Sequence, residues 1–328
     1  MVTPAKISLA LQGGGTHAAF TWGVIDQLLI DGRVTLDAVS ATSGGAMVAA
    51  VLAQGMLESR EAAHELLLQF WRKVSIASNL LPLRMNVVDT FLSHVGFDIA
   101  PGAQALDAIT RLFSPSQFNL FDLNPLRGII EEMVDFEAIK KGPVKLYINA
   151  TNAKTGRSRI FGPDEISLDA VMASSCLPFM FKAVEIDGEP YWDGGFSGCP
   201  PLKPLISDFH PSDIVLVQVH PSSVEDVPTT ATDILDRATE ISFNAVLLQE
   251  IDALEQRNAL IRQGRVDGKP VTIHRIESQD MLSSLGRASK LNADLDFLIY
   301  LHDLGVQAAT DWLALDSGAD DSASEEAA

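Results

Sequence analysis

The chain has 328 residues, of which 43 are acidic and 24 are basic, so its formal net charge at pH 7 is -19. Such an acidic surface excludes nucleic acid as a partner and disfavours electrostatic attraction to anionic membranes. The two cysteines, Cys176 and Cys199, cannot build a disulfide framework and show no metal-ligand spacing. We therefore expect a cytoplasmic protein. No apolar run reaches the length of a signal core or a membrane span, so contact with a membrane or granule should be peripheral.

The first part of the chain alternates apolar strands with helices, which is typical of an α/β domain. Residues 7–11 predict a strand that ends near three glycines, and a helix with apolar spacing follows. Residues 36–40 predict a second strand, followed by a helix over 44–53. Because a crossover helix joins them, the two strands should be parallel neighbours. Another helix is expected over 58–74.

Residues 75–125 lose this periodicity. Pro, Asn and Gly interrupt a segment that is rich in Phe and Leu, and we predict a loosely helical, cap-like insertion. Its apolar side chains either line an acyl groove and meet a lipid surface, or pack inward.

Strand and helix patterns return after the insertion. In chain order we expect strands at 145–151 and 159–161, a helix at 168–174, a hairpin at 184–192, an interior strand at 214–219, a helix at 232–264, a strand at 271–276 and a terminal helix. The hairpin should turn at Asp187-Gly188 and deliver Asp193 at its exit. Residues 1–315 are thus expected to form one α/β domain. Residues 316–328, acidic and without a basic residue, predict a disordered tail.

A sharp strand-to-helix turn surrounds Ser43. The sequence Ala41-Thr42-Ser43-Gly44-Gly45 departs from the GxSxG elbow only at Ala41, where one methyl group replaces the hydrogen of glycine. Small residues such as Ala41 and Gly45 let the helix pass close to the strand, while the elbow lifts the hydroxyl clear of the backbone. Ser43 is therefore the predicted nucleophile.

Three glycines after the first strand can supply backbone donors. The amides of Gly13, Gly14 and Gly15 lie at the head of a helix, where an oxyanion would be stabilised. The same loop fits a dinucleotide pattern, because Gly13, Gly15 and Ala18 match GxGxxG/A and Asp37 follows about twenty residues later. Asp37 stands at the start of its strand, however, away from the end where a ribose would lie.

The serine also needs a base. Asp193, held at the hairpin exit by Gly194 and Gly195, could face Ser43 and accept its proton. Alternatively, Asp193 could be no more than part of an Asp-Gly turn without a catalytic role. His220 is the alternative, because Ser43, Asp193 and His220 follow the chain order of an α/β-hydrolase triad. In that fold, however, several strands precede the elbow, whereas only one precedes it here.

Taken together and in order, four motifs resemble those of the patatin-like phospholipases. They are Gly13-Gly14-Gly15, Ala41-Thr42-Ser43-Gly44-Gly45, Ala173-Ser174-Ser175-Cys176-Leu177-Pro178-Phe179 and Asp193-Gly194-Gly195. The resemblance covers about residues 5–220. It implies a three-layer α/β/α fold with a mainly parallel central sheet, and hydrolysis of acyl esters by a Ser and Asp dyad. Ser43 would then be the nucleophile and Asp193 the base, with no histidine required.

The chain departs from the family pattern at a few positions. His17 and Ala18 stand where the family usually has Arg and Gly, so an arginine contribution near the oxyanion is missing. Ala41 replaces the first glycine of the elbow, and His220 stands where related sequences often carry Asn. The first two changes could lower activity, but the dyad and the triple glycine are intact.

We expect a serine acyl hydrolase that cleaves esters of phospholipids, other lipids or apolar acyl compounds through an acyl-enzyme, with no metal or organic cofactor. An intracellular polyester (polyhydroxyalkanoate) depolymerase or a thioesterase would use the same groups. A dinucleotide-binding protein and a catalytically inactive interaction protein are the alternatives of other classes.

Overall fold

A single mixed sheet runs through the part of the chain that the computed structural model describes, which is residues 5–80, 124–209, 211–278, 285 and 287–325. The eight strands of this sheet are β1 (Ala5–Leu11), β2 (Val34–Ala41), β3 (Lys145–Asn152), β4 (Ser158–Phe161), β5 (Val184–Ile186), β6 (Glu189–Asp193), β7 (Asp213–Gln218) and β8 (Thr272–Glu277). Their order is β5-β6-β3-β2-β1-β7-β8, and β4 pairs with β3.

The sheet is mainly parallel. Strands β3, β2, β1, β7 and β8 pair in parallel, while β4, β5 and β6 form antiparallel pairs at one side. The parallel pairing of β1 with β2 and the interior place of β7 are confirmed. So is the hairpin between β5 and β6, because Asp187 and Gly188 have φ values of 54° and 77°, as a tight two-residue turn requires.

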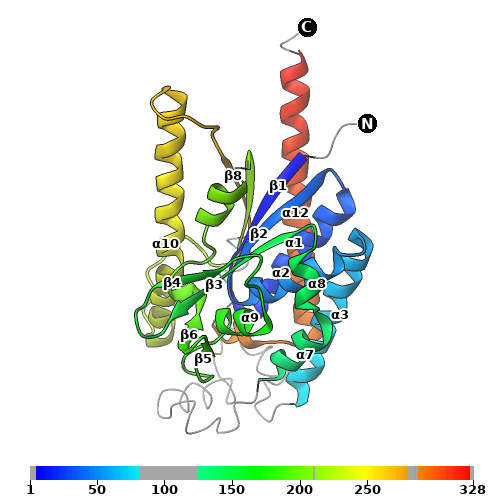
Figure 1. The fold of residues 1–328 in the computed structure, drawn as a ribbon, viewed down its shortest axis with the longest axis vertical. Coiled ribbons are helices and arrows are strands. Elements are labelled where there is room, and N and C mark those ends of the chain that lie inside the picture. Colours follow the sequence, from blue (N-terminus) through cyan, green and yellow to red (C-terminus); the bar gives the residue numbers. More distant parts are fainter. Residues whose placement is uncertain (1–4, 81–123, 210, 279–284, 286, 326–328) are drawn as a thin grey trace.

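Helices cover both faces of the sheet, which completes the three-layer α/β/α fold (Figure 1). The longer helices are α1 (Ala18–Asp31), α2 (Gly44–Gly55), α3 (Arg60–Leu80), α7 (Pro125–Met133), α8 (Phe136–Lys140), α9 (Leu168–Ser174), α10 (Ala231–Arg262) and α12 (Leu295–Glu325). Helices α1, α2, α3 and α12 pack on one face, and α10 packs on the other. Among these described helices, none is both long and apolar enough to cross a membrane.

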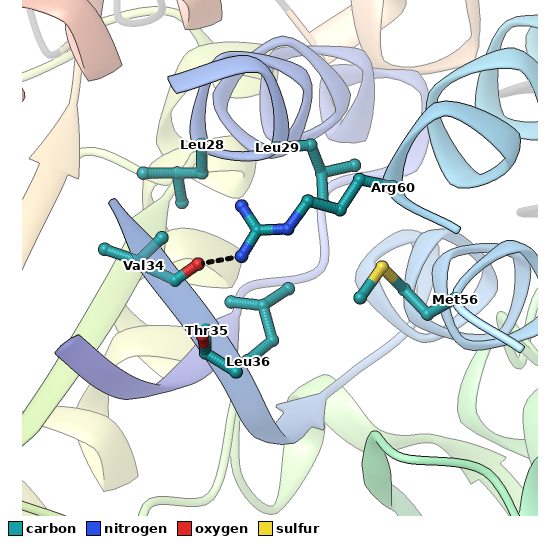
Figure 2. Close-up of a pocket in the computed structure, with 7 residues that line it drawn as sticks. All are labelled: Leu28, Leu29, Val34, Thr35, Leu36, Met56 and Arg60. Atoms are coloured by element: carbon teal, nitrogen blue, oxygen red, sulfur yellow. Dashed lines mark hydrogen bonds between the residues drawn. The ribbon is translucent and has the colours of Figure 1, made fainter. Parts of the chain in front are cut away.

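A small cavity of about 120 Å³ lies at the amino end of β2 (Figure 2). It is lined by Leu28, Leu29, Val34, Thr35, Leu36, Met56 and Arg60. The guanidinium of Arg60 donates a hydrogen bond to the carbonyl of Val34 and closes one side. Because ligands of such sheets bind at the carboxyl ends of the strands, and Ser43 follows that end of β2, this cavity is not the substrate site.

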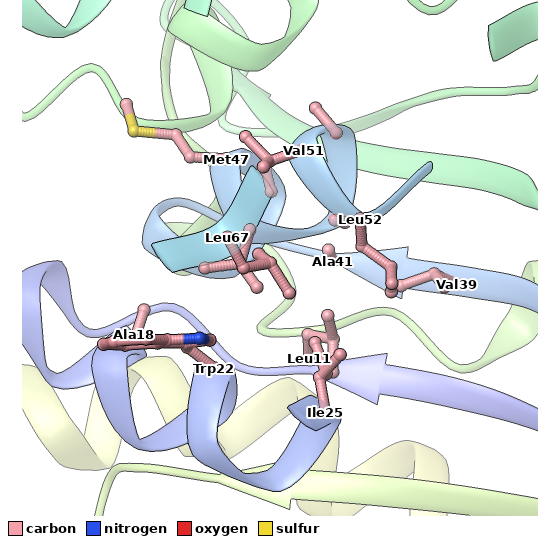
Figure 3. Close-up of a cluster of buried hydrophobic side chains, with 14 of the residues drawn as sticks. Leu11, Ala18, Trp22, Ile25, Val39, Ala41, Met47, Val51, Leu52 and Leu67 are labelled. Atoms are coloured by element: carbon pink, nitrogen blue, oxygen red, sulfur yellow. The ribbon is translucent and has the colours of Figure 1, made fainter. Parts of the chain in front are cut away.

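The main core lies between the sheet and the first three helices (Figure 3). Val39 of β2 lies beside Leu52 of α2, Leu11 of β1 lies beside Ile25 of α1, and all four side chains are buried. Burying one such side chain contributes about 1.5–3 kcal/mol. Alanines dominate the sequence of α2, so this helix can approach the strands closely. The core therefore fixes the carboxyl ends of β1 and β2, from which the two loops of the candidate site leave.

A buried carboxylate links α1 to α12 and α3. The Oδ2 atom of Asp26, which is 1% exposed, lies 3.0 Å from Nε2 of His302 and 3.0 Å from Nδ1 of His64. The other ring nitrogen of His302 lies 3.0 Å from Asp303, and the centroid of its ring lies 4.1 Å from that of Trp22 at an interplanar angle of 45°. Burial alone would lower the pKa of His302, but the bonds to Asp26 and Asp303 outweigh it and raise that pKa.

We expect His302→Gln to lower the free energy of unfolding by about 1–3 kcal/mol at pH 6 and by less at pH 9. A histidine with a raised folded pKa contributes stability that is fully present below its unfolded pKa and is lost as the pH rises through the folded value. Urea denaturation at both pH values measures this. Asp26→Asn should remove the same pH dependence, and an equal loss at both pH values would contradict the assignment.

Two boundaries differ from the sequence-based expectation. Helix α3 continues to Leu80, so residues 75–80 of the predicted insertion are helical; residues 81–123 lie outside the described part of the chain. Helix α12 extends to Glu325, into the segment for which the sequence predicts a disordered tail. Extending an existing helix avoids the cost of nucleation, so an alanine-rich acidic segment can follow the packed part of α12.

Candidate active site

Ser43 lies at the elbow between β2 and α2, on a strained backbone with φ 56° and ψ -126°. The amide of Gly45 donates to the carbonyl of Thr42 at 3.0 Å and closes the turn. The amide of Ser43 itself donates to Oγ of Ser174 at 2.9 Å. Ala41 is the buried last residue of β2. The hydroxyl is thus presented where the strand ends, in a residue that is 9% exposed.

Asp193 ends β6 and meets this hydroxyl. Ser43 Oγ donates to Asp193 Oδ2 at 2.6 Å, although the two residues are 150 positions apart. The amide of Gly195 donates to the other carboxylate oxygen at 2.7 Å, and the carbonyl of Gly194 accepts from Nδ2 of Asn149 at 2.8 Å. Asp193 is completely buried. The turn after β6, which forms the short helix η2 (Gly194–Phe196), therefore holds the carboxylate in one orientation.

Burial raises the pKa of Asp193 to about 6, while the hydrogen bonds from Ser43 and Gly195 act in the opposite direction. The carboxylate is therefore ionised at neutral pH. A base works best when its pKa lies near the working pH. The site thus combines the proton acceptor and the hydroxyl that a nucleophilic serine needs.

The glycine turn lies beside the elbow. A Cβ atom on Gly13 would stand 2.6 Å from Cβ of Ser43. The amide of Gly13, however, donates to Sγ of Cys199 at 3.2 Å. The amides of Gly14 and Gly15 donate to no residue in the described part of the chain. Of the three predicted oxyanion donors, Gly14 and Gly15 are therefore the ones whose N–H groups are not already engaged.

A short helix near the C-terminal part of the chain, η4 (Arg287–Leu291), packs on the glycine turn from outside. Gly15 has φ 59°, and a Cβ there would overlap the carbonyl oxygen of Lys290, so only glycine fits. The hydroxyl of Thr16 donates to the carbonyl of Ser289 at 2.9 Å, and Nε2 of His17 lies 2.8 Å from Oγ of Ser289. The helix therefore secures η1 (Gly15–His17), on which the last glycine lies.

Neither of the two histidines, His17 and His220, forms a hydrogen bond with Ser43 or Asp193 in the described part of the chain. His220 is 3% exposed, and its ring nitrogens have no hydrogen-bond partner among the described residues. Burial is the main cause that lowers the pKa of His220 well below its ordinary value. Burial, followed by the charge of Lys290, lowers the pKa of His17 to about 3. Both imidazoles are thus neutral, and the hydroxyl of Ser43 meets Asp193 instead.

Asp37 does not occupy the place that a dinucleotide site requires. It lies inside β2, four residues before the strand ends at Ala41, and its carboxylate pairs with Lys6 at 3.3 Å. The glycine turn is meanwhile packed against η4 and Ser43. The dinucleotide interpretation of this loop therefore has no support from the arrangement of its residues.

Sequence reasoning missed several residues that hold the site together. Ser174 lies within a motif of the family, but only the structure reveals that it binds the amide of Ser43. Thr151 donates to the carbonyl of Asp193 at 2.8 Å, and Asn149 donates to both Gly194 and Gly198 at 2.8 Å. Their polar side chains inside the buried strand β3 could have pointed to these roles, because a buried polar side chain needs a hydrogen-bond partner.

A sequence model described as Patatin-like phospholipase matches residues 9–206, which is more than half of the chain. The chain therefore belongs to the patatin-like phospholipase family. Membership supports lipid acyl hydrolase activity in general. No curated protein matches the chain.

Two solved structures are similar to this chain at low sequence identity and low TM-score. VipD from Legionella pneumophila is 16% identical with a TM-score of 0.38, and the match covers 92% of this chain and 67% of VipD. Full-length ExoU of the type III secretion system of Pseudomonas aeruginosa, in complex with SpcU, is 15% identical with a TM-score of 0.31; 91% of this chain and 53% of that chain are covered. The chain thus spans about two thirds of VipD and about half of ExoU.

Proposed function

We propose that the protein is a serine acyl hydrolase that cleaves carboxylic esters of lipids with a dyad of Ser43 and Asp193. The observation that carries this proposal is the 2.6 Å hydrogen bond from the elbow hydroxyl to a fully buried carboxylate. Family membership supplies the class of substrate.

In this mechanism Ser43 Oγ attacks the ester carbonyl and Asp193 takes its proton. The amides of Gly14 and Gly15 stabilise the oxyanion of the tetrahedral intermediate. Asp193 then returns the proton to the leaving alcohol, and the acyl-serine remains. In the second half, Asp193 takes a proton from water, which attacks the acyl group. Asp193 then returns that proton to Ser43 Oγ as the acid is released.

Apolar side chains near the two catalytic loops favour an apolar acyl group. Phe196 follows Asp193 by three residues and is 40% exposed, and Phe179, at the end of the segment Ala173-Ser174-Ser175-Cys176-Leu177-Pro178-Phe179, is 62% exposed. Contiguous exposed apolar surface marks contact with apolar ligands or surfaces, and in this proposal the two rings contribute to such a surface. Peripheral contact with a membrane or granule and a cytoplasmic location belong to the same proposal.

Covalent labelling tests the proposal. A fluorophosphonate probe should form an adduct that mass spectrometry locates on Ser43, because the activated hydroxyl attacks phosphorus as it attacks a carbonyl. Labelling should disappear in Ser43→Ala and fall by about a hundredfold or more in Asp193→Asn. His220→Asn is the control and should keep its labelling rate, since the ring of His220 forms a hydrogen bond with neither group among the described residues.

Loss of labelling in His220→Asn would favour a histidine-dependent triad, and no labelling of the wild type would reject the hydrolase. A substrate panel of phospholipids, polyhydroxyalkanoate oligomers and acyl thioesters, assayed with the same variants, then separates the three acyl classes. A polyester or thioester that is cleaved faster than every lipid would overturn the assignment of a lipid substrate.

A further inference from the structure

The side chain of Gln12 connects the glycine turn with two other segments. It lies between β1 and Gly13 and is completely buried. Its Oε1 atom accepts from the amides of Val219 at 2.9 Å and His220 at 2.8 Å. Its Nε2 atom donates to Oδ1 of Asn244 at 2.7 Å and to the carbonyl of Cys199 at 3.4 Å. Every donor and acceptor position of the amide is thus in use.

Asn244 brings the long helix α10 into this network. It is 3% exposed, and its Nδ2 atom donates to the carbonyl of Pro221 at 3.0 Å. The preceding residue, Phe243, packs so closely on Gly195 that a Cβ there would overlap the ring. Gly195 is the residue whose amide holds Asp193. Two adjacent residues of α10 therefore reach both parts of the site. Phe243 contacts the turn that holds Asp193, and Asn244 contacts Gln12, which precedes the three glycines.

We infer that Gln12 is a positioning residue of the proposed reaction, and that its bond to Asn244 sets the glycine turn against the Ser43 and Asp193 pair. This inference rests on the proposed function. Oxyanion donors must lie about 2.7–3.1 Å from the developing charge, and a displacement of about 1 Å can cost roughly a hundredfold in rate. A buried amide with four partners restricts such displacement more than apolar packing does.

Gln12→Met tests the inference, because methionine has a similar length but cannot form these hydrogen bonds. With a short, water-soluble nitrophenyl ester, kcat should fall by about tenfold to a hundredfold, while KM stays within about twofold of wild type. Asn244→Leu removes the same hydrogen bond from the side of α10 and should lower kcat by a similar factor. If Gln12→Met does not fold, the kcat of Asn244→Leu tests the inference in its place. The double variant should lose less than the product of the two single losses.

Asn258 provides a matched control on the same helix. It is 6% exposed, its Nδ2 atom donates to the carbonyl of Val271 at 2.8 Å, and its Oδ1 atom accepts from the amide of Val271 at 3.0 Å. Asn258→Leu should therefore lower the stability of the protein as Asn244→Leu does, yet leave kcat within about twofold. Urea denaturation monitors stability, and kcat is measured where circular dichroism shows every variant to be folded.

Two results would overturn the inference. Gln12→Met could lose stability but keep the wild-type kcat, or Asn258→Leu could lower kcat as much as Asn244→Leu. Either result, with an active wild type, rejects only the role of Gln12 and leaves the Ser43 and Asp193 proposal intact. A wild type that neither hydrolyses the ester nor accepts the fluorophosphonate on Ser43 rejects the proposed function and this inference with it.

Discussion

Replacing Ser43 with glycine should abolish hydrolysis and give a more stable protein than replacing it with alanine. Both changes remove the proposed nucleophile, so the rate should fall by about 10⁴-fold or more. The backbone at this position has φ 56° and ψ -126°, where a side chain costs on the order of 1–3 kcal/mol and glycine costs far less.

The difference in stability between the two variants measures the cost of the backbone conformation at residue 43, because each variant loses the same hydroxyl and the same hydrogen bond to Asp193. Glycine is ordinarily less favourable than alanine by about 0.5–1 kcal/mol, so the expected order is the reverse of the usual one. Urea denaturation should place Ser43→Gly above Ser43→Ala by about 1 kcal/mol. If Ser43→Ala were more stable than Ser43→Gly, the backbone of the elbow would not be strained in the folded protein.

Asp193→Asn should also separate activity from stability. Loss of the base should lower kcat/KM by about a hundredfold to ten-thousandfold. The wild-type kcat/KM should rise with pH through about 6, the value to which burial raises the pKa of Asp193. Asparagine can keep both contacts, donating to Ser43 and accepting from Gly195, so the fold should be preserved.

The same substitution should stabilise the protein above pH 6. The pKa of Asp193 rises from 3.8 to about 6 on folding, so ionisation opposes the folded state from about pH 4 upward, and the penalty is complete above about pH 6. A shift of this size corresponds to about 3 kcal/mol. Urea denaturation at pH 4 and pH 8 should reveal a gain for Asp193→Asn only at pH 8. Asp252→Asn, an exposed control on α10, should give no such gain.

The predicted elements came from local patterns, and most of them are present. The apolar strand at residues 7–11 and the small residues around Ser43 depend on neighbours in the chain, so periodicity and turn chemistry can reveal them. The Asp187-Gly188 turn is local in the same way, and it predicts where Asp193 leaves the hairpin. The end of α12 escaped prediction because composition alone does not distinguish a solvated tail from the extension of a packed helix.

The partners of the site residues could not be predicted, because they lie far away in the chain. No pattern around Gln12 points to Asn244, which is 232 residues away. Nor does any pattern around Gly13 reveal that Cys199 accepts its amide hydrogen bond. Such contacts depend on which strands become neighbours, and strand order follows from the packing of the whole sheet.

The amino-acid sequence by itself determined the elbow at Ser43, the glycine turn, the aspartate at the hairpin exit and the α/β class, because each follows from short-range sterics and periodic burial. Only the tertiary structure decided that Asp193 rather than His220 meets the hydroxyl, that the amide of Gly13 is already hydrogen-bonded, and that α10 contacts both loops of the candidate site. These outcomes depend on distances between separate segments, which packing sets and local sequence does not encode.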